Sequence, residues 1–252
     1  MNHTLNIISS TFASTLRGWR GTSGSKTVEQ PASPLVIYDR EGCPDCRLVR
    51  EALTELNLDV LIMPCPEGSN RNKRQLEAVS GQSTVPFLAD QNTGKKVSGA
   101  AAIIDYLFQQ YRGKSAPAQI KPATLNRLTS RLASAIRGNA GVQARPARMA
   151  EQPLTLYSFE SSPFSRVVRE RLCELELPYH LVNLGKQQWA DMGPAKMRFA
   201  PGPYAPLANT KRDAFFKAHG NVQVPYLIDP NTNTQLFESA DILKYLAKTY
   251  AL

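Results

Sequence analysis

Residues 34–58 read PLVIYDREGCPDCRLVREALTELNL, and this stretch decides the fold. The run 35–38 is rich in strand-forming residues, and a short turn follows it. After Pro44 the apolar residues recur at helical spacing, which predicts an amphipathic helix. Cys43 therefore lies at a helix N-terminus, where unpaired backbone amides and the positive end of the helix dipole favour a thiolate. Cys46 follows one turn into the same helix.

The chain contains this stretch twice. Residues 153–177 read PLTLYSFESSPFSRVVRERLCELEL and align with it without a gap, with thirteen of twenty-five positions identical. The cysteines differ between the copies, because Ser162 stands in place of Cys43 and Ser165 in place of Cys46. We infer that one fold was duplicated and that its reactive centre then changed.

Both copies predict the same order of elements: strand, helix, strand, helix, strand, strand, helix. Residues 84–107 recur as 223–246, with ten of twenty-four positions identical. The offset between the copies grows from 119 to 139 along the chain, so the second copy holds an insertion. We place the insertion within 186–211, whose glycines and prolines predict an extended loop.

Length and composition agree with a globular chain of two modules. The chain has 252 residues, 42% of them hydrophobic. We find no run that approaches the roughly 18 apolar residues of a membrane span. Four cysteines are too few for a disulfide scaffold, and the sequence shows no secretory signal. These features predict a cytoplasmic protein without a membrane span.

The net charge of +9 is concentrated in one segment. Eight Lys or Arg and no Asp or Glu occur between Arg112 and Arg148. We interpret this segment as a solvated basic linker with a helix around 124–137, and we do not expect nucleic-acid binding. The alternative is an electrostatic docking surface for RNA, anionic lipid or an acidic partner.

The first 33 residues are basic and rich in Ser and Thr, as in an organellar presequence. However, ASTLRG at 13–18 recurs as ASAIRG at 133–138, and a cleaved peptide has no reason to recur inside the chain. We therefore expect a short helix that belongs to each module. The predicted organisation is a leader at 1–33, module 1 at 34–111, a basic helical linker at 112–152 and module 2 at 153–252.

Three motifs together resemble a known family. Cys-Pro-x-Cys after a strand, Thr-Val-Pro about forty residues later and a final Glu-Ser-x-x-Ile helix are similar to glutaredoxins and to the N-terminal domain of soluble glutathione transferases. The resemblance covers 34–111 and again 153–250, and no all-helical transferase domain follows either copy. It implies an α/β chain of two tandem thioredoxin-like modules. Each module would be a separate four-stranded mixed sheet flanked by helices.

The resemblance also implies where glutathione binds. The proline before the third strand is cis in the family, and the backbone before it pairs with glutathione or an extended peptide. This pattern is matched by Val85-Pro86 and Val224-Pro225.

The Glu-Ser pair at the start of the last helix holds the γ-glutamyl group of glutathione in the family. Glu238 and Ser239 match this pair, although Ser239 could also be an ordinary helix cap. Gly99 and Ala100 stand at the corresponding positions of module 1 and do not match.

The function that we predict from these motifs is that of a glutathione-linked thiol–disulfide oxidoreductase. Cys43 would attack a disulfide or a glutathionylated protein, Cys46 would resolve the mixed disulfide, and glutathione would restore the dithiol. Asp45, between the two cysteines, is expected to oppose the Cys43 thiolate. Cys65 could be a third redox partner. The oligomeric state stays open.

Two other functions remain as alternatives. Ser162 matches the activating serine of serine-type transferases, so module 2 could transfer glutathione. The chain could also be a non-catalytic module that binds glutathione or a peptide. Zinc at Cys43 and Cys46 would need a second clustered ligand pair, which the sequence does not offer, and an iron–sulfur cluster shared with glutathione is a further alternative. We expect no metal.

Overall fold

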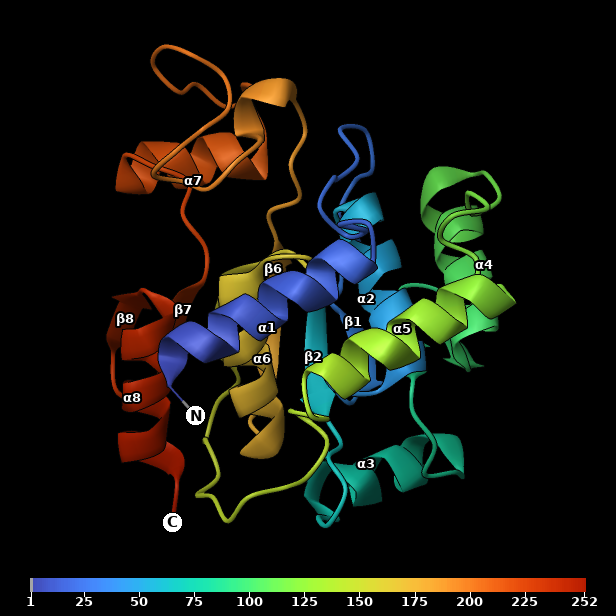
Figure 1. The fold of residues 1–252 in the computed structure, drawn as a ribbon. Helices are drawn as coiled ribbons and strands as arrows, with labels where there is room; N and C mark the ends of the chain where they lie inside the picture. The colour runs from blue at the N-terminus through green and yellow to red at the C-terminus, as the bar shows by residue number, and fades with distance from the viewer. Residues whose placement is uncertain (1) are drawn as a thin grey trace.

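The computed structural model describes residues 2–252 (Figure 1). Within that range eight strands form one mixed sheet in the order β4-β3-β1-β2-β6-β5-β7-β8. The strands of the first half are β1 (Leu35–Asp39), β2 (Val60–Pro64), β3 (Phe87–Asp90) and β4 (Lys95–Ser98). Those of the second half are β5 (Leu154–Ser158), β6 (Tyr179–Asn183), β7 (Tyr226–Asp229) and β8 (Thr234–Phe237).

The helices follow the predicted order in both halves. The first half contains α1 (His3–Leu16), α2 (Pro44–Leu56), α3 (Arg71–Ser80) and α4 (Ala100–Arg112). The second half contains α5 (Thr124–Ile136), α6 (Pro163–Glu174), the 3-10 turn η1 (Trp189–Asp191), α7 (Lys211–His219) and α8 (Ser239–Tyr250). The predicted insertion lies between β6 and α7, where η1 is the regular element.

The sheet separates one large core from two small ones. Leu35 and Ile37 of β1 belong to the large core, together with apolar residues of α2, α4, α6 and α8. Tyr38 lies in a small cluster with Leu76 of α3. Since neighbouring residues of a strand point to opposite faces, α3 covers the face opposite α2. A corresponding cluster around Phe215 lies under α7.

The expectation that each module would keep its own sheet is wrong. The strand β2 pairs with β6 in antiparallel fashion, with Leu61 opposite His180. Val60, Ile62, Tyr179 and Leu181 all belong to the same buried core. The physical reason is that β2 and β6 would otherwise be exposed apolar edge strands, which pair readily. The duplication itself holds, because each half contributes four strands and the same order of helices.

The leader and linker helices cross to the opposite half. Helix α1 packs on α6, α5 packs on α2, and the two helices contact each other (Figure 1). The contacts are reciprocal: the Ser10 hydroxyl donates to the Pro163 carbonyl at 3.0 Å, and the Ser130 hydroxyl donates to the Pro44 carbonyl at 2.8 Å. The recurring helix was predicted from the sequence, whereas its exchange between the modules was not.

The segments that follow α1 and α5 also cross over. The Ser161 amide donates to the Gly21 carbonyl at 3.1 Å, and the Gly42 amide donates to the Gly141 carbonyl at 3.3 Å. A Cβ atom on Gly21 would lie 2.7 Å from Cβ of Glu160, at a φ of +73°. Gly141 has the same constraint against Glu41. Glycine is required at both crossings because the backbone must approach a buried glutamate closely.

That pair of glutamates belongs to a buried cluster, here called the central ion network, made of Asp39, Glu41, Arg50, Glu160 and Arg169. Arg50 lies 2.7 Å from Asp39 and 3.0 Å from Glu160. Arg169 lies 3.0 Å from Glu41 and 2.9 Å from Glu160. Burial by itself would raise the pKa of Glu160, but Arg169, Arg50 and other arginines lower it to about 2. The network therefore joins α2 and α6 across the two modules.

We expect Glu160→Gln to lower the free energy of unfolding by about 3–5 kcal/mol, because it leaves buried arginines without their charge partner. The loss should appear as a single cooperative transition, since both modules share the network. Glu67→Gln is the matched control: Glu67 pairs with Arg40 at 2.5 Å on the surface, and its loss should cost less than about 1 kcal/mol. Chemical denaturation measures both variants. Two separate transitions, or equal losses for the two variants, would contradict this account.

Candidate functional site

The strand registers gather the predicted module 1 residues at one edge of the sheet. Tyr38 at the end of β1 lies opposite Phe87 at the start of β3, and Phe87 lies opposite Ser98 at the end of β4. Cys43 follows β1 after residues 40–42, the dipeptide Val85-Pro86 immediately precedes β3, and Gly99 immediately follows β4. They are therefore brought to the same edge. The Val85-Pro86 peptide bond is cis, as predicted.

The same registers operate in module 2. Tyr157 of β5 lies opposite Tyr226 of β7, which lies opposite Phe237 of β8. The predicted residues Ser162, Val224, Pro225, Glu238 and Ser239 adjoin these strand ends. The Val224-Pro225 bond is also cis.

The two sites lie at opposite edges of the continuous sheet. Strand β1 is parallel to β2, β2 is antiparallel to β6, and β6 is parallel to β5. Hence β1 and β5 run in opposite directions, and the helices that follow them begin at opposite edges. Cys43 and Ser162 do not face each other.

Cys43 is the N-cap of α2, and its sulfur accepts a hydrogen bond from the Cys46 amide at 3.5 Å. Cys43 is partly exposed, whereas Cys46 is fully buried. The side chain of Cys46 donates to Cys43, and together with backbone amides it outweighs burial and lowers the pKa of Cys43 to about 7. Burial raises the pKa of Cys46 well above its usual value. The pair therefore combines one accessible acidic thiol with one protected thiol.

The expectation about Asp45 needs correction. Its carboxylate lies 3.5 Å from Arg127 of α5, where both side chains are half exposed. The carboxylate that raises the pKa of Cys43 is that of Asp39, while the backbone amide of Asp45 helps to lower it. Asp45 therefore does not prevent an acidic Cys43, because Arg127 offsets its charge and its amide faces the sulfur.

The two remaining cysteines are buried. Cys65 packs against Tyr38 and Phe87 on the α3 face, and burial raises the pKa of its thiol to about 12. This opposes the redox role considered for Cys65. Cys173 accepts a hydrogen bond from the Glu41 amide at 3.4 Å and donates to the Gly141 carbonyl at 3.2 Å. It packs at the crossing between the modules.

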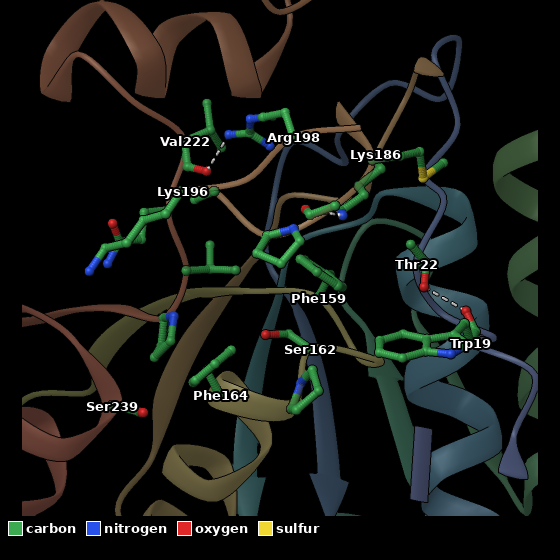
Figure 2. Close-up of a pocket in the computed structure, with 18 of the residues that line it drawn as sticks. Trp19, Thr22, Phe159, Ser162, Phe164, Lys186, Lys196, Arg198, Val222 and Ser239 are labelled. Atoms are coloured by element: carbon green, nitrogen blue, oxygen red, sulfur yellow. Dashed lines mark hydrogen bonds between the residues drawn. The ribbon is translucent and has the colours of Figure 1, made fainter. Parts of the chain in front are cut away.

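Module 2 contains a cavity of about 720 Å³ (Figure 2). All five predicted module 2 residues line it, namely Ser162, Val224, Pro225, Glu238 and Ser239. One wall is formed by the insertion, from Met192 to Phe199, and another by Trp19 and Thr22 of the crossing leader. The residues that line one part of this cavity belong to the repeated module, whereas its walls belong to the insertion and to the exchanged leader.

Ser162 occupies the position that corresponds to Cys43. It is the N-cap of α6, and its hydroxyl accepts a hydrogen bond from the Ser165 amide at 3.3 Å. As an oxygen at a helix N-terminus inside a cavity, it can also donate its proton to an anion. The Ser165 hydroxyl is buried and has no hydrogen-bond partner among the described residues. Of the two hydroxyls, that of Ser162 belongs to a residue that lines the cavity at the helix N-terminus.

Glu238 has an unusual backbone conformation, with φ of 62° and ψ of 118°. Glycine occupies the equivalent position in module 1, where Gly99 has φ of 82°. A glutamate in this region is strained, and such strain tends to persist at functional positions. Its carboxylate accepts hydrogen bonds from Gln223 at 2.8 Å and from Lys196 at 3.3 Å. These two hydrogen bonds hold the carboxylate at the cavity.

Ser239 is buried at the first position of α8, and its hydroxyl lies 3.1 Å from Nε2 of His3. This contact was missed in the sequence, because His3 belongs to the leader and reaches module 2 only through the exchange. The hydroxyl already has one partner, so it acts both in the cavity wall and in anchoring α1.

Four cationic residues that line the cavity were also missed, and Lys186 and Arg198 are two of them. Lys186 donates to the Gly193 carbonyl at 2.8 Å, and burial, followed by Arg212 and Arg198, lowers its pKa to about 8. Arg198 donates to the Val222 carbonyl at 2.9 Å and stacks on Tyr204. Figure 2 shows both above Ser162, on the side of the insertion. Lysines and arginines in an insertion carry no periodic signal that could have identified them.

Within residues 2–252, no three His, Cys, Asp or Glu side chains form a cluster that could hold a metal ion. In the same range no helix combines the length and the apolar character needed to cross a bilayer.

The lowered pKa of Cys43 predicts a pH-dependent reactivity. Iodoacetamide reacts with the thiolate, so the rate at Cys43 should rise with pH and reach half its maximum near the pKa of about 7. Cys46 should stay unmodified in the folded protein at these pH values, because its pKa is raised and it is buried. Mass spectrometry of alkylated peptides measures both sites. Equal rates at the two cysteines near neutral pH would show that the assignment is wrong.

The comparisons with known proteins agree with the fold. The family model described as "Glutathione S-transferase, N-terminal domain" matches residues 37–115 and again residues 156–252. Neither the curated proteins nor the solved structures give a match to the chain. The family model covers more than half of the sequence in two segments that correspond to the two modules. The chain therefore belongs to the family of the glutathione S-transferase N-terminal domain, which it contains twice.

Proposed function

We propose that the protein is a glutathione-linked thiol–disulfide oxidoreductase that acts through Cys43 and Cys46. The observation that carries the proposal is the position of Cys43: a partly exposed N-cap thiol with a pKa of about 7, beside a buried second thiol. About half of such a thiol is ionised at neutral pH, and a thiolate is the nucleophile of disulfide exchange.

The reaction follows from the two environments. The Cys43 thiolate attacks a sulfur of the substrate disulfide, forms a mixed disulfide with it and releases the other sulfur as a thiolate. Cys46 then loses its proton and attacks the Cys43 sulfur, which releases the second substrate thiol and leaves a Cys43–Cys46 disulfide. Two glutathione molecules reduce this disulfide and become oxidised glutathione. The substrate class is a disulfide or a glutathionylated protein, and reduced glutathione implies a reducing compartment such as the cytoplasm.

Glutathione reaches Cys43 from solution in this proposal. Gly99 and Ala100 give module 1 no side-chain ligands for the γ-glutamyl group, so its contacts reduce to backbone groups near Val85 and Pro86. The module 2 cavity lies at the other sheet edge and would act as a separate glutathione site. Weak binding beside Cys43 suits a step in which glutathione reacts and leaves.

Turnover of a glutathionylated peptide by the full chain, with glutathione as reductant, tests the proposal. Cys43→Ser should abolish turnover because it removes the nucleophile. Cys46→Ser should slow turnover or accumulate a mixed disulfide that mass spectrometry detects. Cys65→Ser, which changes a buried thiol outside the pair, should leave the rate unchanged. Full activity of Cys43→Ser would overturn the proposal.

A second candidate function is glutathione transfer in module 2. The specific observation in its favour is that the cavity of about 720 Å³ gathers Ser162, Val224-Pro225, Glu238 and Ser239 beneath an apolar wall. Glu238 and Ser239 offer an acceptor for the ammonium and a donor for the carboxylate of the γ-glutamyl group. Ser162 would donate to the glutathione sulfur and favour its thiolate.

Calorimetric titration of the full chain with glutathione, carried out in a Cys43→Ser background, tests the cavity. Ser239→Ala should weaken binding about ten-fold or more, because a hydroxyl bonded to a charged group is lost. Ser162→Ala should bind glutathione nearly as well but conjugate an electrophile more slowly.

Two variants serve as controls for this experiment. Ser165→Ala removes a hydroxyl without a partner and should change neither property. His3→Ala breaks the contact to Ser239 while keeping the serine, so it separates ligand binding from the anchoring of α1. If Ser239→Ala leaves the affinity unchanged, or if His3→Ala reproduces its effect, the proposed role of Ser239 is wrong.

A further inference from the structure

Helix α1 presents its apolar side to solvent. Its buried side is made of small residues, Ser10, Ala13 and Ser14. Its exposed side carries large apolar residues at helical spacing, with exposed fractions of 56% for Leu5, 47% for Ile8, 63% for Phe12 and 37% for Leu16. A helix on the surface of a globular protein normally turns its apolar stripe toward the core. In α1 this arrangement is reversed.

Helix α5 repeats the reversal at the matching positions. It buries Ser130, Ala133 and Ser134. It exposes Leu125, Leu128, Leu132 and Ile136, with fractions from 44% to 69%. Because the same pattern occurs in both copies of the leader, we infer that the exposed apolar side is not accidental. Because small residues lie inward, the two helices pack closely on α6 and α2, and their large side chains remain outside.

The two stripes form one surface. Helices α1 and α5 contact each other and lie side by side across the front of the molecule in Figure 1. The surface formed by their exposed side chains is here called the docking face. Monomeric proteins seldom expose a contiguous apolar patch of this kind without a binding function. No described residue of the chain covers these side chains.

The charged residues of the docking face indicate which kind of partner it fits. Neither α1 nor α5 contains an Asp or Glu. Arg131 is exposed among the leucines of α5, and Arg127, which is also exposed, lies 3.5 Å from the carboxylate of Asp45 on α2. The α1 and α5 helices of a second copy would offer no acidic side chain to pair with Arg131. An apolar helical surface bordered by arginines matches the boundary between acyl chains and anionic headgroups.

We propose that the docking face binds the surface of a lipid bilayer that contains anionic headgroups. The leucines, isoleucines and Phe12 would enter the boundary of the acyl chains, while Arg131, which is in no ion pair among the described residues, would contact the phosphates. Trp19, just after α1, is 42% exposed and is a residue type that favours this boundary. Trp19 and Thr11 also line the module 2 cavity, so the bound membrane would lie beside that cavity. This binding does not depend on catalysis at either site.

Co-sedimentation with vesicles tests the proposal on the full chain. Vesicles of phosphatidylcholine mixed with phosphatidylglycerol should bind the protein, and those of phosphatidylcholine alone should bind it weakly. The double variant Phe12→Ser/Leu132→Ser should lower the partition coefficient more than about ten-fold, because two side chains no longer enter the bilayer. Arg131→Gln should lower it about five-fold on the mixed vesicles, and added salt should weaken binding of the wild type.

Matched variants outside the docking face serve as controls. Met149→Ser changes an exposed apolar residue in the segment after α5, and Lys244→Gln removes an exposed charge from α8. Both should bind like the wild type, and thermal unfolding verifies that all variants are folded. The proposal fails if the wild type does not bind mixed vesicles or if the controls lose as much binding as the docking-face variants. It also fails if the wild type ignores vesicles and forms a dimer that the double variant dissociates, because the face would then join two copies.

Discussion

The buried charges between the two modules constrain the rest of the structure. Removing an ion from water costs several kcal/mol, so Asp39, Glu41, Arg50, Glu160 and Arg169 are tolerated only because each meets an opposite charge at short range. Arg50 reaches Glu160, and Arg169 reaches Glu41, so each half supplies the partners of the other. Within each half, Arg50 also meets Asp39 and Arg169 also meets Glu160, so the contacts between the halves add partners to charges that are already paired. The network therefore helps to hold the two domains of the same family together.

The exchange of the leader helices follows from the same constraint. Arg17 at the end of α1 pairs with Glu51 of α2 at 2.6 Å, while α1 itself lies on α6. Arg137 pairs reciprocally with Glu170 at 2.7 Å. Each leader thus contacts both halves through a buried ion pair. The exchange also has a consequence for the cavity, since the crossing leader delivers Trp19 and Thr22 to the wall of module 2.

Most of the fold within each module could be predicted from the sequence. The periodicity of apolar residues and the turn residues located the strands and helices. Each element depends on a local sequence pattern, and the same pattern occurs in both copies. The joining of β2 to β6 could not be predicted, since an apolar strand such as VLIMP reads the same at an edge as inside a sheet. The exchange was hidden for a similar reason: ASTLRG and ASAIRG reveal a repeated helix but not the partner on which it packs.

The candidate sites show the same division. The sequence could place several candidate residues at the ends of strands and helices, where position along the chain fixes position in space. These residues are Cys43, Ser162, Val224-Pro225 and Glu238-Ser239. Lys186, Arg198 and His3 were missed because long-range packing brings them to the cavity. The effect of Asp45 was misjudged because its partner, Arg127, comes from the exchanged helix.

The direction of the central strand pair determines how the two sites can cooperate. A parallel pairing of β2 and β6 would have placed both helix N-termini at one edge of the sheet. The antiparallel pairing places them at opposite edges and leaves each helix N-terminus with its own solvent access. The N-cap residues at these two edges differ, with Cys43 at one and Ser162 at the other. The central ion network joins the halves and also acts on one of these termini, because its member Asp39 raises the pKa of the Cys43 thiol.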